Sequence, residues 1–188
     1  YEIGVRLVGS EMCIRDRTHA MGFKGVLGGE YNFNRTEASI WKRFWLPASW
    51  GKIDCSVKAG AEWNTVPFPL LILPEANLSY ITQRETFCLI NNMEFLNDRF
   101  ASMSISYDMN GKLFNRIPLL KNLKWREMFR VRALWGTLTD KNNPFKSSNP
   151  DLFRFPTRDG KFTSFVMDPK VPYVEASVGI YNLSLIHI

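Results

Sequence analysis

The amino-acid sequence predicts an all-β protein built on a long-stranded antiparallel sheet. Residues 125–135 (WREMFRVRALW) alternate apolar and charged side chains, and three further segments of eight or more residues alternate in the same way. Successive side chains of a strand point to opposite faces, so each segment predicts a strand with one apolar and one polar face. Strands of soluble proteins average about five to six residues. These longer segments favour an open fragment of a transmembrane β-barrel, whose strands alternate over about ten residues.

The segment 125–135 has a tryptophan at each end, Trp125 and Trp135. Ten residues of strand span roughly 33 Å. Tilted by about 40°, they rise roughly 25 Å, which is the height of the lipid-facing band of a membrane barrel with aromatic girdles at its rims. A soluble sheet with one wet face also alternates, so this segment alone leaves both interpretations open.

The other predicted strands follow the same pattern. Residues 52–63, 100–110 and 173–182 alternate cleanly, whereas residues 34–45 keep a clean parity only at Ala38, Ile40 and Phe44. Turn-forming residues at 46–52, 109–112 and 139–144 separate these segments, as expected for antiparallel neighbours.

Two connecting segments are unusual because they are long or apolar. Residues 66–87 and 114–123 could form a hairpin extension packed on the rim, or a short helix near residues 75–80. Alternatively, they could lie at a membrane interface or fold into the mouth of the lumen. Residues 146–161, rich in Pro, Asn, Ser and Asp, predict a surface-exposed loop.

Composition excludes several classes. Hydrophobic residues make up 45% of the chain and aromatic residues 14%, which argues against disorder, and no apolar run is long enough to predict a transmembrane helix. The net charge of +6 permits nucleic-acid binding, but no RNP, zinc-finger or KH signature is present. The three cysteines and two histidines form no metal or catalytic motif. We therefore expect no enzyme activity, no cofactor, no metal and no nucleic-acid partner.

Both ends of the chain carry unusual strings. LVGSEMCIRDR at residues 7–17 and LSLIHI at residues 183–188 resemble translated sequencing adapter. We expect residues 1–17 and 183–188 to be foreign sequence, and residues 18–182 to be a partial outer-membrane β-barrel from a longer protein.

Two segments of the chain support a family resemblance. The string FNRIPLLKNLKWREMFRVRALWGTLTDKNNP, followed by PYVEASVGIYN, resembles the C-terminal outer-membrane barrel of carboxypeptidase-regulatory-like-domain-containing proteins of unknown function from Gram-negative bacteria. ASIWKRFWLPASWGKIDCSVKAGAEWNTVPFPLL resembles the preceding strands of that barrel. The resemblance implies an N-terminal regulatory-like β-sandwich without peptidase chemistry, and it supplies no catalytic residue.

Alternation and resemblance together predict which side chains face where. Lipid-facing candidates are Ile53, Val57, Phe129, Val131, Val178 and Ile180. Membrane-interface candidates are Trp63, Trp125 and Trp135. Lumen-facing candidates are the cationic row Lys124, Arg126, Arg130 and Arg132, offset by Asp54, Glu62, Asp108 and Glu175. The cationic row could favour anions or form mutual salt bridges. Glu127 falls on the lipid parity, where an interfacial position next to Trp125 would make a charge tolerable.

The expected function is a non-catalytic role in transport, biogenesis or envelope architecture, with outer-membrane lipid and other envelope proteins as partners. The alternative is a soluble or periplasmic β-sandwich that binds carbohydrate or peptide. Its strands should be shorter and its outward side chains polar.

Overall fold

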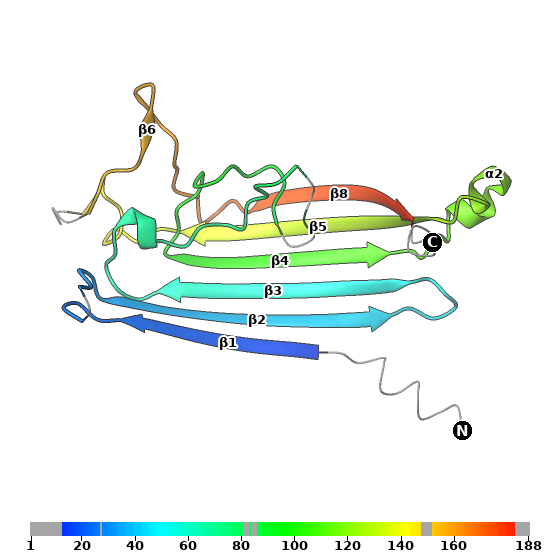
Figure 1. Ribbon diagram of the computed structural model, residues 1–188, viewed down its shortest axis with the longest axis horizontal. Coiled ribbons are helices and arrows are strands. Elements are labelled where there is room, and N and C mark those ends of the chain that lie inside the picture. Colours follow the sequence, from blue (N-terminus) through cyan, green and yellow to red (C-terminus); the bar gives the residue numbers. More distant parts are fainter. Residues whose placement is uncertain (1–12, 27, 81–82, 84–85, 148–151, 183–188) are drawn as a thin grey trace.

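The fold is an open six-stranded antiparallel sheet with the strand order β1-β2-β3-β4-β5-β8 (Figure 1). The computed structural model describes residues 13–26, 28–80, 83, 86–147 and 152–182. The strands of the sheet are β1 (Cys13–Gly22), β2 (Phe33–Trp45), β3 (Lys52–Glu62), β4 (Arg99–Asp108), β5 (Trp125–Thr137) and β8 (Tyr173–Asn182). The predicted all-β class and open antiparallel sheet are confirmed.

The remaining elements are short. A two-stranded hairpin consists of β6 (Thr157–Arg158) and β7 (Lys161–Phe162), and the helical turns are η1 (Phe68–Leu70), η2 (Phe114–Arg116) and α2 (Pro118–Lys121). None of the helices in the described ranges has the length and apolar character needed to cross a membrane. No helix forms over residues 75–80, which removes the short helix considered for that segment.

The strands β3, β5 and β8 begin at the residues where the alternation begins, because period-two patterning satisfies both faces of a strand at once. β2 departs from regular alternation, which made its prediction the weakest. Trp41 and Trp45 lie on its polar side, while Lys42 lies on its apolar side. β1 includes residues 13–17, which the sequence analysis set aside as adapter-like, and pairs with β2 along its whole length. LSLIHI and residues 7–12 of the other adapter-like string lie outside the described residues.

The two ends of the sheet differ in the length of their connections. At the turn end, residues 46–51 join β2 to β3 and residues 109–124 join β4 to β5. At the loop end, residues 23–32, 63–98 and 138–172 join the other neighbouring strands (Figure 1). The two longest connections therefore meet at the same end.

A hydrophobic cluster and a buried carboxylate hold the loop-end connections together. The cluster consists of five buried side chains from both long connections: Val66, Leu71, Leu96, Leu138 and Phe155. Asp98 is fully buried, and its Oδ2 accepts hydrogen bonds from the Thr139 backbone N–H at 3.1 Å and from the Asn142 side-chain amide at 3.0 Å. Asn142 Oδ1 in turn accepts from the Val66 N–H at 2.9 Å. Residues of the predicted polar turn at 139–144 thus hold the two long connections together through hydrogen bonds.

Gly51 closes the turn between β2 and β3, and we predict that Gly51→Ala destabilises the sheet. Its φ is +91°, and an added Cβ would lie 1.8 Å from the backbone oxygen of Asp108. The left-handed conformation alone costs about 1–2 kcal/mol for a residue with a Cβ. The steric contact adds to that, so we expect a loss of about 3 kcal/mol or more in the free energy of unfolding, measured by urea titration.

Gly160→Ala is the matched control for this prediction. Gly160 has φ +75°, but no atom lies within 4 Å of its added Cβ. The Gly160→Ala variant should therefore lose only the conformational part of the free energy of unfolding, about 1–2 kcal/mol. Equal losses in the two variants would contradict the steric role of Gly51.

Candidate functional site

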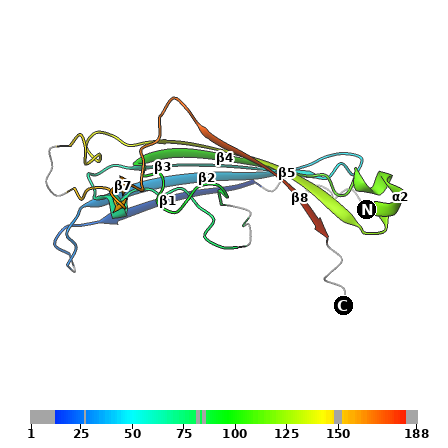
Figure 2. The ribbon, with the colours of Figure 1, turned by 90° about the horizontal axis from the view of Figure 1, so that it is seen from above.

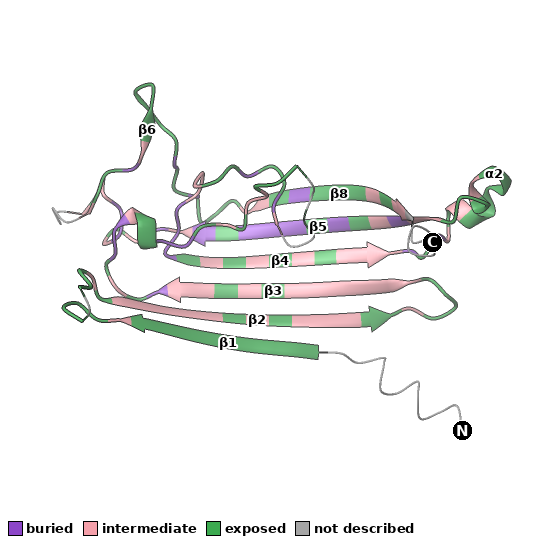
Figure 3. Cartoon of the chain, in the orientation of Figure 1, coloured by how far each residue is buried: buried purple, intermediate pink, exposed green. Residues whose placement is uncertain are grey.

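The sheet has two chemically distinct faces, and the cross-strand register defines both. The apolar face carries the rows Ile40–Val57–Met103–Ala133–Val174 and Phe44–Ile53–Tyr107–Phe129–Val178, with Cys55–Ile105–Val131–Ala176 between them. The first two rows cross five strands, and the third crosses four. Most of the large apolar side chains in these rows are exposed, from 36% at Ile105 to 71% at Val178, whereas Ala133 is buried and Ile53, Cys55 and Tyr107 are half-buried. The strands in Figure 3 accordingly alternate between exposed and less exposed residues.

Aromatic residues and a polar row border the apolar face. Trp135 and Trp63 lie toward the loop end, where Trp63 Nε1 donates a hydrogen bond to Thr36 Oγ1 at 3.0 Å. Trp125 lies at the turn end, and the hydroxyl of Tyr107 donates to the backbone oxygen of Trp50 at 3.1 Å nearby. Beyond Trp135, the next row contains Thr36, Arg99 and Thr137. The apolar band is therefore bounded along the strands.

Charged residues interrupt this face at three places. β1 places Arg15 and Arg17 on it, opposite Ile40 and Ala38. The Lys42 ammonium lies 5.0 Å from the centre of the Phe44 ring. Glu127 is only 3% exposed, and its carboxylate accepts hydrogen bonds from the backbone N–H groups of Leu113 and Phe114. These bonds explain how a carboxylate can occupy an apolar-face position.

The opposite, polar face carries cross-strand ion pairs. Arg43 of β2 binds Asp54 of β3 through two hydrogen bonds, of 2.6 and 3.1 Å. Lys52 of β3 lies 4.0 Å from Asp108 of β4, which also accepts a hydrogen bond from the Tyr181 hydroxyl of β8. Charges on this face are thus largely compensated by side chains on neighbouring strands.

Arg43 is a polar-face residue that the sequence analysis did not single out. Its guanidinium lies 5.0 Å from the Trp41 ring and 5.8 Å from the Trp45 ring, both on the same face. Cation–π contacts of this kind add to the ion pair with Asp54. The alternation of Trp41, Arg43 and Trp45 was the available signal, although the irregular parity of β2 obscured it.

A hollow of about 740 Å³ lies on the polar face. Polar and charged side chains from the strands line much of it, among them Arg43, Asp54, Ser56, Lys58, Ser106 and Arg130. The hollow also reaches Glu75 and Phe87 of the connection 63–98. A wet groove along one face of the sheet is therefore partly covered by a loop.

That connection folds back over the polar face instead of extending from the sheet. Phe87, Ile90 and Met167 pack on Leu134, with Phe100 and Tyr173 beside them, in a second hydrophobic cluster. Lys58 Nζ lies 2.7 Å from Glu75 Oε1. In Figure 2, where the sheet is seen from above, part of this green connection lies to one side of the strands. This placement over the polar face was not among the alternatives considered for residues 66–87, and the membrane-interface and lumen-mouth alternatives stay predictions.

Glu175 holds the connection 63–98 over the polar face. Its carboxylate accepts hydrogen bonds from the backbone N–H groups of Cys88 and Leu89, at 3.0 and 3.3 Å, and from Arg132 at 3.4 Å. The Arg132 and Glu175 side chains are only 2% and 7% exposed. The guanidinium of Arg132 also lies 5.9 Å from the centre of the Phe87 ring.

The remaining predicted polar residues fall into different environments. Arg126 lies on the polar face opposite Tyr181, and Arg130 lies opposite Ser106 and Ser177. Glu62 is buried near the loop end, where Oε1 accepts from the N–H groups of Asn34 and Asn64. Lys124 lies in the connection before β5 at φ +51° and is exposed. The predicted set is thus brought to one face, except for Lys124.

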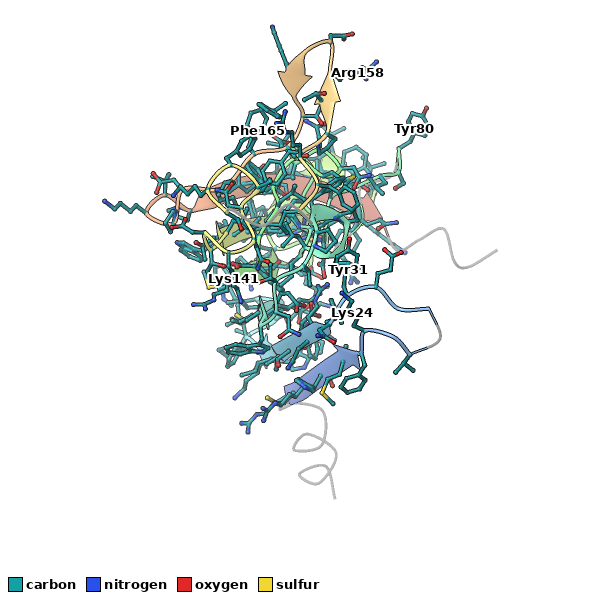
Figure 4. The ribbon with its side chains drawn as sticks, turned by 90° about the vertical axis from the view of Figure 1, so that its left-hand side faces the viewer. Lys24, Tyr31, Tyr80, Lys141, Arg158 and Phe165 are labelled. Carbon is teal, nitrogen blue, oxygen red and sulfur yellow. The ribbon has the colours of Figure 1, made fainter. Side chains whose placement is uncertain are left out.

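A second, polar hollow of about 510 Å³ lies at the loop end, lined by residues that include Lys24, Tyr31, Trp63 and Lys141. Lys141 Nζ donates to the Trp63 backbone oxygen at 2.5 Å. Figure 4 looks at this end and labels three of these residues, while Tyr80 projects away from the body. Within the described ranges, no group of three or more His, Cys, Asp or Glu side chains could hold a metal ion.

The fold and the two faces define a class: an open antiparallel β-sheet protein with one exposed apolar face and one ion-paired, partly covered polar face. Residues 17–146 match the family model described as "Family of unknown function (DUF5686) C-terminal domain". The match covers more than half of the chain, so the chain belongs to this family. No curated protein and no solved structure matches the chain.

Glu175→Gln should loosen the cover over the polar face. The substitution keeps the shape of the side chain but removes the charge that compensates buried Arg132. Breaking a buried pair in this way costs about 3 kcal/mol. We expect the amide hydrogen exchange of Cys88 and Leu89 to become about 100-fold faster, measured by NMR or mass spectrometry.

Asp140→Asn provides the control for that experiment. Asp140 pairs with Lys146 at 3.1 Å, but both side chains are mostly exposed. Exposed pairs contribute about 0–1 kcal/mol. If Asp140→Asn accelerated exchange at Cys88 and Leu89 as much as Glu175→Gln does, the anchoring role of Glu175 would be wrong.

Proposed function

We propose that the sheet is part of the wall of a β-barrel that spans the outer membrane of a Gram-negative bacterium, with the apolar face toward lipid and the polar face toward the lumen. Its role is non-catalytic, in transport, biogenesis or envelope architecture. The observation that carries the proposal is the set of apolar rows across neighbouring strands, in which most of the large side chains are at least 36% exposed. A large exposed apolar surface is unfavourable in water and favourable against hydrocarbon.

The arrangement of the borders supports the same proposal. Trp125 and Trp135 flank the apolar rows of β5, and aromatic side chains favour the two interfaces of a bilayer. The strands are 10–13 residues long, which suits a tilted strand crossing about 30 Å of hydrocarbon. The two longest connections lie at one end of the sheet, and longer loops at one end than at the other are typical of outer-membrane barrels.

The polar face supports a lumen function with compensated charge. Of the two accounts considered for the cationic row, the pair Arg132–Glu175 favours mutual salt bridges over a free anion-selective row. The pair Arg43–Asp54, outside that row, compensates charge on the same face in the same way. The connection 63–98 would then narrow the lumen at the loop end, since it contacts Lys58 and Arg132.

The proposal extends to the identity of the parent protein. We take residues 18–182 as the native barrel segment and the adapter-like ends as foreign. We also propose that the barrel follows a carboxypeptidase-regulatory-like domain, as the resemblance of residues 114–144 and 172–182 implies. Resequencing the source locus across both ends tests the two statements together.

Val57→Arg should destabilise the protein in a bilayer, whereas Ser56→Arg should not. The two residues are adjacent in β3, but Val57 is on the apolar face and Ser56 lines the polar hollow. An arginine on the lipid face near the bilayer midplane costs about 2–4 kcal/mol. Folding free energies of the complete protein in phosphatidylcholine vesicles, measured by urea titration, check this difference.

Two results together would overturn the proposal. If Val57→Arg were neutral and the protein stayed folded and monomeric in buffer without lipid or detergent, the apolar face would not contact hydrocarbon. A soluble β-sandwich that binds carbohydrate or peptide would then become the better account of the sheet.

A further inference from the structure

The connection at the turn end between β4 and β5 has an unusual composition. Residues 109–124 (MNGKLFNRIPLLKNLK) contain four basic residues and no acidic residue. The segment is ordered by a continuous series of turns, including the hydrogen bonds from Asn115 N–H to Gly111 O at 2.9 Å and from Lys121 N–H to Ile117 O at 3.0 Å. It contains η2 and α2 and lies beyond the strand ends (Figures 1 and 2).

Two kinds of contact fix this segment to the sheet. The Glu127 carboxylate accepts hydrogen bonds from the N–H groups of Leu113 and Phe114, at 2.5 and 3.1 Å. The Phe114 ring packs edge-on against Trp125, with 6.2 Å between the ring centres. Because Trp125 and Glu127 belong to the apolar face, the segment continues that face past its aromatic border.

A third contact comes from the neighbouring turn. Lys112 Nζ donates to the Ala48 backbone oxygen at 3.0 Å and lies 4.9 Å from the centre of the Trp50 ring. The two turns at this end are therefore joined, and the position of the segment does not depend on α2 alone.

The side chains that remain exposed are both apolar and basic. Leu119 is 84% exposed, and Leu113, Ile117 and Leu123 are each close to 45% exposed. Arg116, Lys121 and Lys124 are exposed among them. Short segments that combine exposed leucine and isoleucine with lysine and arginine bind in the interface of anionic membranes. Each basic residue near such a surface strengthens the attraction to anionic lipid.

We propose that residues 109–124 form an interfacial anchor that inserts Leu119 and its apolar neighbours among anionic phospholipid head groups at the turn end. This inference rests on the proposed membrane-spanning function and adds a lipid specificity to it. The uniformly basic charge selects an anionic surface, and the continuity with Trp125 places the anchor at the rim of the same bilayer. Lys121, Lys124 and Arg116 hold the head-group phosphates, while the leucines replace lipid tails at the surface.

Three fluorescent probes test the anchor in the complete protein. In a background whose cysteines are replaced, Cys55→Ala and Cys88→Ser among them, an environment-sensitive dye is attached to Leu119→Cys, Val131→Cys or Leu78→Cys. Val131 reports the centre of the apolar face, and Leu78 is an equally exposed leucine in the loop-end connection. Vesicles contain phosphatidylcholine with 30% phosphatidylglycerol, and either lipid can carry a head-group spin label as quencher.

If the anchor forms, the probe at position 119 should be shielded from water and quenched by spin labels on the lipid head groups. Spin-labelled phosphatidylglycerol should quench its fluorescence at least twofold more strongly than spin-labelled phosphatidylcholine. The probe at position 78 should remain in water. Replacing Arg116, Lys121 and Lys124 by Gln should abolish the preference for phosphatidylglycerol. The matched triple replacement of exposed Lys24, Arg158 and Lys161 by Gln should leave it unchanged.

Each failure has its own meaning. A water-exposed probe at position 119 beside a hydrocarbon-buried probe at position 131 would overturn the anchor, leave the membrane-spanning proposal standing and make the segment a surface for a protein partner. Water-exposed probes at both positions would overturn the membrane-spanning proposal and the anchor with it. A preference for phosphatidylglycerol that survives the triple replacement would overturn the assigned role of the basic residues.

Discussion

The strict pairing of six antiparallel strands is the constraint on which the rest of the structure depends. Each strand is in continuous register with its neighbours, so side chains from different strands form straight rows. A shift of one residue in any strand would move its apolar set to the polar face. For β5 that shift would bring Phe129 and Val131 among the ion pairs and would expose Arg130 and Arg132 on the apolar face. Every property of the two faces follows from this register.

The polar face shows how the protein keeps so many charges close together. Asp54, Asp108 and Glu175 each have a basic partner on an adjacent strand. The half-buried pairs contribute little individually. The buried Arg132–Glu175 pair is different, because the same carboxylate also holds the backbone of the covering loop. Charge compensation and loop placement are therefore coupled at Glu175.

The hydrophobic clusters lie where the long connections meet the sheet, and their members come from the loops and from the loop-end residues of β4, β5 and β8. The central rows of the apolar face belong to neither cluster. Packing among the described residues thus stabilises the loop end, while the middle of the sheet exposes its apolar side chains. This distribution is consistent with the proposed bilayer surroundings and with the proposed anchor at residues 109–124.

The sequence by itself determined the strands β3, β4, β5 and β8 and the separation of their faces, because a period of two is a local property of alternating residues. It predicted β2 only weakly, and it did not predict β1 or the hairpin of β6 and β7. It also placed Trp125 and Trp135 ten positions apart and marked the turn at Asn110 and Gly111. Only the tertiary structure decided the partners: that Arg43 binds Asp54, that Glu175 holds Cys88 and Leu89, and that Glu127 caps the turn at Leu113. These contacts join residues far apart in the chain, and register and loop closure, which no local pattern encodes, bring them together.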